Sequence, residues 1–310
     1  MKRMGLTFAL TLLAATACRA GERYALVIGV NECPQFHLEG GATARPLRGA
    51  ESDADAVASA LEKQFGFPAA HIELIKGPQA TYEAMKAACE RLRKKARRGD
   101  CVVLHYSGHG TQLPDRAPFD EAADKLDEAL CLANATDAGE NLLIDDELGE
   151  WLDSIEASEL TVILDCCHAG TGTKDTQDDI VARYLPFPGV GKARQPQTPW
   201  RELKGSTKGL FGRRTAFFAC QPREQAYERR LQEEGTPARV GQFTHYLLLG
   251  LTSGQADADG NGKVSNAEAL EFARTQLDNR FNRGREPDAR QQPILDSDDP
   301  DAPAIVGKLP

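Results

Sequence analysis

Cys101-Val-Val-Leu-His-Tyr-Ser-Gly-His-Gly110 and Thr161-Val-Ile-Leu-Asp-Cys-Cys-His-Ala-Gly170 set the architecture of this 310-residue chain. Each begins as a short apolar run typical of a buried strand and ends in a turn with glycine, histidine and, in the second case, cysteine. Glycine permits a tight turn and the close approach of another backbone. Two such strands predict a sheet with chemically active side chains gathered at one edge.

Strand and helix patterns alternate on both sides of these stretches. Further strands are expected at 24–30, 71–76, 128–133 and 215–220, and helices at 50–65, 81–96, 145–155 and 243–252. This alternation predicts an α/β fold with about six mostly parallel strands and helices on both faces. Sites in such sheets lie at the carboxyl ends of strands, where His109 and Cys167 are expected to meet.

Composition limits the function classes. A hydrophobic content of 41% and a charged content of 27% are ordinary for a soluble globular protein. The net charge of -9 argues against nucleic-acid binding, which needs a basic face. It fits a cationic substrate or a divalent cation.

The first twenty residues differ from the rest. Lys2 and Arg3 precede an apolar run at 6–17 that ends in small residues, which is the pattern of a secretory signal peptide. Ala15-Thr-Ala-Cys18 also resembles a lipoprotein box, in which Cys18 would carry a lipid. An exported protein is expected, and it would be periplasmic, lipid-anchored or secreted.

The other cysteines do not form a disulfide framework. They number seven, which is odd, and no Cys-x-x-Cys pair suggests zinc.

A thiol peptidase needs a thiolate nucleophile, a base within hydrogen-bond reach and donors for the oxyanion. His109 and Cys167 meet this need if their side chains lie close together and open to solvent.

Tyr106-Ser-Gly-His-Gly110 and Asp165-Cys-Cys-His-Ala-Gly170 closely resemble the paired motifs of metacaspases and bacterial caspase homologues, peptidase family C14. The resemblance runs from Tyr24 to about Leu277. It implies a caspase-haemoglobinase-like three-layer sandwich and a monomer. The Gln-Ala-Cys-x-Gly motif of animal caspases is absent, which favours the metacaspase side.

The resemblance also assigns roles. Cys167 matches the family nucleophile, and its neighbour Cys166 matches a position without a catalytic role. His109, not His105, matches the base. The backbone N–H groups of Gly110 and Cys167 would form the oxyanion hole. No third carboxylate of a triad is evident.

Metacaspases hold a basic P1 residue, the one before the scissile bond, between two aspartates. The matching positions are Asp53 and Asp165, so protein or peptide substrates with P1 Arg or Lys are expected. Two alternatives stay open. In the first, Asp53 only stabilises the start of a helix and does not bind substrate. In the second, Arg48 binds an anion and directs cleavage after Asp.

A long loop at 172–212 follows the nucleophile and breaks the strand–helix pattern. It is either a solvated linker or the place of self-cleavage. Its candidate basic residues include Lys174, Arg183, Lys192, Arg194, Lys204 and Lys208.

Residues 257–268 match the calcium loop of an EF-hand. The ligands would be Asp257, Asp259, Asn261, the carbonyl of Lys263, Ser265 and Glu268, with Gly262 at the sharp turn. The alternative is a turn that caps a helix without metal.

A second, acidic calcium site is implied by the resemblance alone. Its best matches are Asp145 and Asp146, with Asp124 and Asp175 as looser candidates; the alternative is that Asp145 and Asp146 only cap a helix.

The chain thus divides into a signal peptide at 1–20, a peptidase domain at 21–254, an EF-hand-like part at 255–280 and a tail at 281–310, acidic and solvated at 296–301. The leading hypothesis is a cysteine endopeptidase with a Cys-His dyad and an acyl-enzyme intermediate, activated by calcium. The alternative is a catalytically silent caspase-fold module for calcium-dependent binding.

Overall fold

The computed structural model describes residues 21–116, 125–167, 180–190, 212–222, 224–231 and 239–305. The expected signal peptide at 1–20, with Cys18, lies outside the described residues, as does most of the loop at 172–212. Within the described part of the chain, no helix has the length and apolar character needed to cross a membrane.

A six-stranded sheet forms the middle layer, in the order β12-β9-β7-β3-β1-β2. Its strands are β1 (Arg23–Gly29), β2 (Ile72–Lys76), β3 (Cys101–Ser107), β7 (Glu159–Asp165), β9 (Arg213–Phe218) and β12 (Ile294–Ser297). All neighbours are parallel except β12, which runs antiparallel to β9. The central neighbours β3 and β7 end level with each other, Ser107 opposite Asp165.

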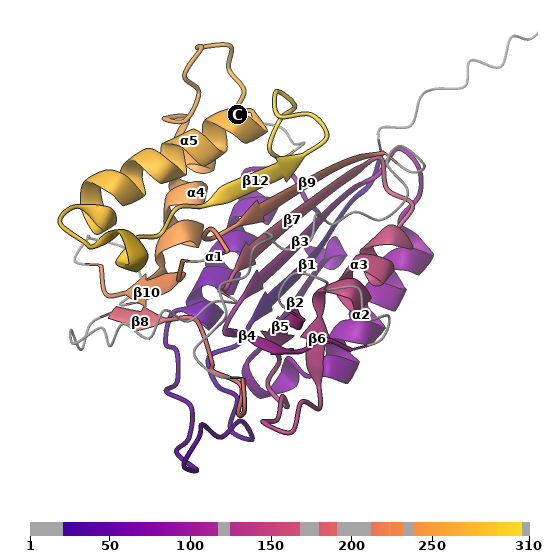
Figure 1. The fold of residues 1–310 in the computed structure, drawn as a ribbon. Helices are drawn as coiled ribbons and strands as arrows, with labels where there is room; N and C mark the ends of the chain where they lie inside the picture. Colours follow the sequence, from indigo (N-terminus) through magenta and orange to yellow (C-terminus); the bar gives the residue numbers. More distant parts are fainter. Residues whose placement is uncertain are drawn as a thin grey trace, which may run out of the picture.

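Helices cover both faces of this sheet (Figure 1). One face carries α1 (Ala50–Lys63), α4 (Gln242–Ser253) and α5 (Asn266–Leu277), and the other carries α2 (Tyr82–Lys95) and α3 (Asp145–Asp153). Strand β1 shows why two cores form. Ala25 and Val27 pack with the first set of helices, while Leu26 and Ile28 pack with the second. Successive side chains of a strand point to opposite faces. The predicted three-layer α/β sandwich is confirmed.

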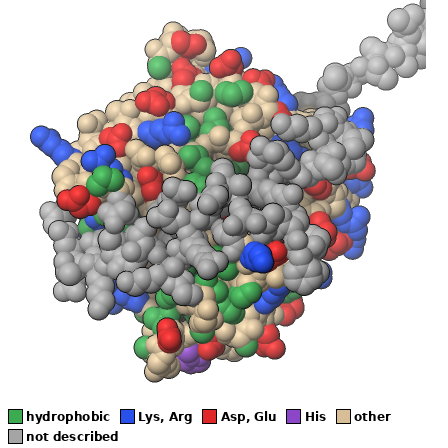
Figure 2. All heavy atoms as spheres, in the orientation of Figure 1, with side chains coloured by type: hydrophobic (Ala, Val, Ile, Leu, Met, Phe, Trp, Pro, Cys, Tyr) green, Lys and Arg blue, Asp and Glu red, His purple; other side chains and the backbone are tan. Residues whose placement is uncertain are grey.

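Two small antiparallel sheets lie near the end to which the arrows of the parallel strands point (Figure 1). One contains β4 (Gly110–Pro114), β5 (Leu126–Cys131) and β6 (Leu142–Ile144), and the other β8 (Ile180–Ala182), β10 (Tyr227–Arg229) and β11 (Val240–Gly241). Short helical turns are η1 (Ala69–His71), η2 (Gly77–Gln79), η3 (Asp278–Asn282) and η4 (Pro287–Ala289). On the face drawn in Figure 2, acidic and basic side chains are interspersed.

Two expectations about the sheet are wrong. The strand expected at 128–133 belongs to the small sheet of β4 and β6, and the sixth central strand is β12, inside the expected tail. The side chains of Asp296, Asp298 and Asp301 are exposed, as expected, but the backbone of this segment is bonded, since the N–H of Ala267 donates to the carbonyl of Pro300 at 2.9 Å. Strand β12 pairs the edge of β9, which would otherwise expose unpaired backbone groups.

Candidate active site

The central sheet brings His109 and Cys167 to the same edge. His109 and Cys167 each lie two residues beyond the end of their strand, and these strands are parallel neighbours. The N–H groups of Gly110 and Cys167 donate to one oxygen, the carbonyl of Arg183, at 2.9 and 3.3 Å. The two groups expected to form an oxyanion hole therefore converge on a single carbonyl.

His109 is held by a backbone group. Its Nε2 lies 3.1 Å from the carbonyl oxygen of Arg45, which can only accept, so Nε2 carries the proton. Nδ1 remains as the nitrogen that can take up a proton, and it has no hydrogen-bond partner among the described residues. Burial lowers the pKa of His109 to about 4, so the ring is neutral at pH 7. The carbonyl of Arg45 thus orients the imidazole.

Cys167 is closed off from solvent, with 0% of its surface exposed. Its Sγ lies 3.9 Å from the carbonyl oxygen of Ala226, and burial raises the thiol pKa to about 12. Within the described part of the chain, no hydrogen bond joins Cys167 to His109. The expectation that both side chains are open to solvent is wrong for this structure, because a segment of the chain itself covers them.

That segment is 180–185. Strand β8 pairs antiparallel with β10, and the N–H of Arg183 donates to the carbonyl of Ala226 at 2.8 Å. On the other side of Arg183, the N–H of Leu185 donates to the carbonyl of Gly110 at 2.9 Å. The backbone is therefore bonded on both sides of Arg183, as an extended peptide is when it joins a sheet edge. The carbonyl of Arg183 is thereby held at the two N–H groups that were expected to bind an oxyanion.

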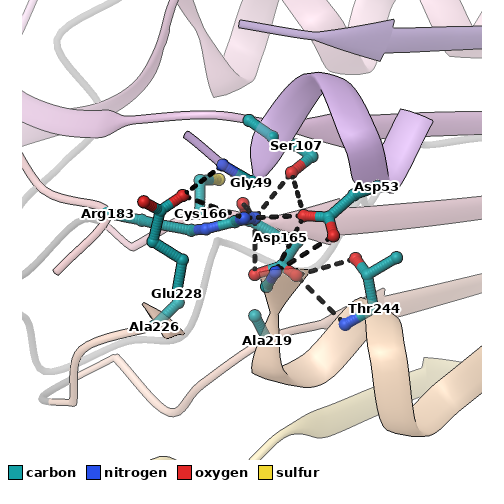
Figure 3. Close-up of polar contacts among 12 residues, drawn as sticks. Gly49, Asp53, Ser107, Asp165, Cys166, Arg183, Ala219, Ala226, Glu228 and Thr244 are labelled. Carbon is teal, nitrogen blue, oxygen red and sulfur yellow. Dashed lines mark hydrogen bonds and ion pairs between the residues drawn. The ribbon is translucent and has the colours of Figure 1, made fainter. Parts of the chain in front are cut away.

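The guanidinium of Arg183 is fully buried among three carboxylates (Figure 3). Its Nη2 lies 2.6 Å from Asp53 Oδ2 and 3.8 Å from Glu228 Oε2, while its Nη1 lies 3.2 Å from Asp165 Oδ1. Nη1 also donates to Ser107 Oγ at 2.6 Å. Charge-assisted bonds of this kind compensate the cost of burying the guanidinium. Asp53 and Asp165 therefore hold an arginine of the chain itself.

The backbone around the pocket holds its acids in place. The N–H of Gly241 donates to Asp53 Oδ1 at 3.0 Å, and the N–H and hydroxyl of Thr244 donate to Asp165 Oδ2 at 3.0 and 2.7 Å. Glu228 accepts from the N–H of Gly49 at 2.8 Å. Burial raises the pKa of Asp53 to about 6, against the lowering effect of the guanidinium of Arg183.

Sequence reasoning missed the third carboxylate, Glu228, and the residues that hold Asp53 and Asp165 in place. Glu228 lies in the three-residue strand β10, and Gly241 and Thr244 lie at the start of α4. The sequence around these three residues does not identify them as pocket residues, because they reach the pocket only through contacts between distant parts of the chain. The short apolar run Ile180-Val-Ala182 before Arg183 was the one local signal of an ordered strand inside the loop.

The neighbouring candidates lie in different surroundings. His105 is buried inside β3 near the hydroxyl of Thr244, and burial lowers its pKa to about 3. Cys166 packs with the core under α2 and α3, whereas Cys167 packs with the opposite core. His168 lies outside the described residues. All seven described cysteines, Cys33, Cys89, Cys101, Cys131, Cys166, Cys167 and Cys220, are free thiols.

The EF-hand-like loop joins α4 to α5. Oxygens of Asp257, Asp259 and Glu268 lie within 4.8 Å of one another, a donor set that suits a hard cation such as calcium. The N–H of Gly262 donates to Asp257 Oδ2 at 2.9 Å, which closes the sharp turn. Glu268 also forms a capping box with Ser265 at the start of α5. Glu268 therefore belongs both to this acidic group and to the helix cap.

The four acids of the second expected calcium site are only partly described. Asp145 and Asp146 begin α3, and burial raises the pKa of Asp146, with Glu150 and Asp115 adding to the effect. In the described ranges these acids do not join three close metal-ligating groups. Asp124 and Asp175 lie outside the described residues.

A family model described as the caspase domain, of peptidase family C14, matches residues 22–304. The chain therefore belongs to the caspase-domain family, as its paired motifs indicated. Membership of a family of cysteine peptidases is the finding that favours this chemistry for the chain.

Similar proteins agree with this assignment. Metacaspase-1A of Aspergillus oryzae is 30% identical over 50% of this chain, and Metacaspase-1A of Aspergillus niger is 26% identical over 71% of it. The chain spans 36% and 54% of the length of these two relatives. The crystal structure of protein GSU0716 from Geobacter sulfurreducens matches 93% of this chain and 98% of its own, with a TM-score of 0.60 and 25% identity.

Proposed function

We propose that this chain is a cysteine endopeptidase that cleaves after Arg or Lys, with Cys167 as nucleophile and His109 as base. The position of Arg183 carries the proposal. Its carbonyl accepts from the N–H groups of Gly110 and Cys167, and its guanidinium is buried among three carboxylates. A pocket of this charge would repel a P1 aspartate, which counts against cleavage after Asp.

Each proposed step uses a group with a place in this geometry. Cys167 Sγ attacks the carbonyl carbon of the P1 residue, and its proton passes to His109 Nδ1. The N–H groups of Gly110 and Cys167 stabilise the oxyanion. The C–N bond then breaks as His109 returns the proton to the leaving amine, which leaves an acyl-enzyme. Water, deprotonated by His109, attacks the thioester, and the carboxylate product leaves as Cys167 regains its proton.

The covered state belongs to the same proposal. With segment 180–185 in place, thiol and imidazole are both neutral, and other substrates are excluded. We propose that the first substrate is the bond between Arg183 and Tyr184. Intact-mass analysis should find a new N-terminus at Tyr184 in the wild-type chain. Cys167→Ala should remain uncut; a cut at Tyr184 in this variant would contradict cleavage by Cys167.

The decisive test uses fluorogenic peptides with P1 Arg, Lys or Asp. The mature chain is assayed after self-cleavage, with and without calcium, beside Cys167→Ala. Cleavage after Arg or Lys that disappears in the variant would support the nucleophile and the acidic pocket together. Cleavage after Asp would indicate that Arg48, and not the pair Asp53 and Asp165, determines the specificity. No cleavage of any peptide, even with segment 180–185 cut, would favour the silent binding module.

We further propose that calcium binds the loop at 257–268 and favours the active state. Helix α4 supplies the physical link. Its first turn contains Thr244, which donates to Asp165, and its last residues lead into the loop. An α-helix of its twelve residues is about 18 Å long, so metal binding at one end acts on a rigid element that contacts the pocket at the other. The four acids of the second site remain candidates for a further calcium ion.

We also propose that residues 1–20 direct export, with Cys18 either lipidated or removed with the leader. Fractionation of cells that express the full chain or Cys18→Ser tests this. Membrane association lost in the variant would support a lipid anchor. Retention in the cytosol of both proteins would contradict export.

A further inference from the structure

The peptide group between His109 and Gly110 is held at both of its ends. Its N–H, on Gly110, donates to the carbonyl of Arg183 at 2.9 Å. Its carbonyl oxygen, on His109, accepts from the N–H of Cys131 at 3.0 Å and from the hydroxyl of Tyr106 at 2.7 Å. A peptide group is planar and rigid. Two donors on its oxygen therefore fix the direction in which its N–H points.

Tyr106 reaches this peptide group from the face of the sheet opposite to the proposed P1 pocket. In β3, Ser107 donates to Asp53 in that pocket, whereas Tyr106 is fully buried in the core under α2 and α3. Successive side chains of a strand point to opposite faces. Gly108 leaves room for the phenol, since a Cβ there would lie 2.4 Å from its hydroxyl oxygen. The turn after β3 is thus built around this hydroxyl.

The hydroxyl of Tyr106 is a lasting donor. Burial raises its pKa well above the ordinary value of 10, so it keeps its proton at neutral pH. A phenol has one proton to donate, and the carbonyls of His109 at 2.7 Å and Cys131 at 2.9 Å share it. A donor on the carbonyl oxygen polarises a peptide group, which then donates more strongly through its own N–H. The bond from Tyr106 therefore acts on the hydrogen bond that Gly110 makes at the other end of the group.

We propose that Tyr106 is a positioning residue for catalysis: its hydroxyl orients and polarises the His109–Gly110 peptide group, so that the N–H of Gly110 stabilises the oxyanion. The proposal rests on the proposed peptidase function and adds a residue to it. Two contacts then hold His109 separately, because the carbonyl of Arg45 orients the imidazole and Tyr106 fixes the backbone. Loss of the hydroxyl should reduce stabilisation of the transition state without changing substrate binding or the basicity of the imidazole.

Tyr106→Phe tests this in the self-cleaved enzyme with a P1 Arg peptide. Loss of an oxyanion donor lowers kcat on the order of 100-fold or more, so loss of one bond that orients the donor should lower kcat about tenfold. KM should stay within about twofold of the wild-type value, and the acidic limb of the pH profile of kcat/KM should not move. Tyr82→Phe is the matched control, because it removes the hydroxyl bond to Glu147 between α2 and α3. Its kcat should equal that of the wild-type chain.

Gly108→Ala reaches the same bond while the whole tyrosine stays in the core, and it decides the question if Tyr106→Phe does not fold. Its φ is not positive, so alanine fits the backbone, but its Cβ would displace the hydroxyl. We expect a similar fall in kcat, and a double variant no slower than the slower single one, since both changes act through one bond.

The outcomes separate this proposal from the peptidase function. A wild-type kcat in either variant, or falls that multiply in the double variant, would overturn the role of Tyr106 and leave the peptidase standing. A shifted acidic limb or a KM raised as much as kcat is lowered would also overturn it, because the substitution would then have disturbed the whole site. Failure of the wild-type chain to cleave the peptide would overturn both.

Discussion

Gly241 shows how tightly a single residue can define the proposed P1 pocket. A Cβ at this position would lie 2.3 Å from Asp165 Oδ2 and 2.7 Å from Cζ of Arg183. Its φ of −65° is open to any residue, so the substitution Gly241→Ala changes the pocket and not the backbone. We expect kcat/KM for P1 Arg peptides to fall at least about tenfold, mainly through KM, since the guanidinium loses its paired geometry.

Gly149→Ala is the matched control for this prediction. A Cβ at Gly149, inside α3, would meet no atom within 4 Å, and alanine favours helix. Its KM should equal that of the wild-type chain. If Gly241→Ala also kept the wild-type KM, the guanidinium of a bound substrate could not occupy the position that Arg183 has here.

The buried histidines make a residue-scale prediction about pH. The pKa of His109 is lowered to about 4 by burial, so the folded chain keeps the ring neutral while the unfolded chain is protonated below its ordinary value of 6.5. Its contribution to stability is complete above pH 6.5 and is lost as pH falls toward 4. The slope is about 1.4 kcal/mol per pH unit within that window. His109→Gln should therefore lose less stability between pH 6.5 and 5 than the wild-type chain.

Urea unfolding at several pH values measures this difference, with His37→Gln, an exposed residue, as control. Only the difference between variants is diagnostic, because buried carboxyls act in the opposite sense. The pKa of Glu224, for example, is raised to about 7 by burial. Identical pH slopes for His109→Gln and the wild-type chain would show that His109 is not held neutral by burial.

The limits of sequence reasoning are clearest at the scale of residues. His109 and Cys167 could be predicted as a pair because each follows an apolar run and is followed by glycine in the sequence, and the family resemblance selected Cys167 over Cys166. The carbonyl of Arg45, which orients His109, could not be found, since every residue has a carbonyl and only the folded backbone selects one. Glu228 was hidden for a related reason: it faces the pocket only because β10 pairs with β8.

At the scale of elements, the loop between α4 and α5 combines the proposed cation site with a helix cap. Glu268→Gln separates them, because glutamine can keep the capping box but removes a charged calcium ligand. We expect calcium to raise the Tm of the wild-type chain and to leave that of Glu268→Gln almost unchanged. In the absence of calcium, Ser265→Ala should lower stability by about 1 kcal/mol through loss of the cap.

Thermal unfolding with calcium chloride or chelator decides between the two roles. If calcium did not change the Tm of the wild-type chain, the loop would act only as a helix cap. If calcium raised the Tm of Glu268→Gln as much as that of the wild-type chain, the ion would bind at another site.

The strand count illustrates how element-level prediction succeeds and fails together. Six strands were expected in the central sheet, and six are present there. However, β5 was assigned to the wrong sheet and β12 was overlooked. Apolar runs reveal strands but not their partners, since pairing depends on chain segments far apart. Strand β12 was hidden by the acidic residues around Ile294–Ser297, which suggested solvent, although an edge strand buries only part of its surface.

At the scale of the whole molecule, the bond between Arg183 and Tyr184 divides the sheet between two pieces. Strands β1, β2, β3 and β7 precede it, and β9 and β12 follow it. The seam is a parallel pairing of β7 with β9 over six residue pairs. It is reinforced where Arg213 of β9 forms an ion pair with Glu159 of β7.

The pocket is divided in the same way. The residues up to 183 supply His109, Cys167, Asp53 and Asp165, whereas Glu228, Gly241 and Thr244 come from the later piece. Neither piece alone has a complete site. Because β7, β9 and the helices on both faces share continuous cores, cutting one covering segment leaves most buried apolar surface in place.

We therefore expect the self-cleaved chain to elute from a sizing column at the position of the uncut Cys167→Ala chain, while denaturing gels show two pieces. Separation of the pieces in urea should abolish peptide cleavage, and mixing them during removal of urea should restore part of it, since both contribute to the pocket. Two separate peaks under native conditions would contradict a shared core. Full activity in the isolated N-terminal piece would show that Glu228, Gly241 and Thr244 are not needed to hold the P1 residue.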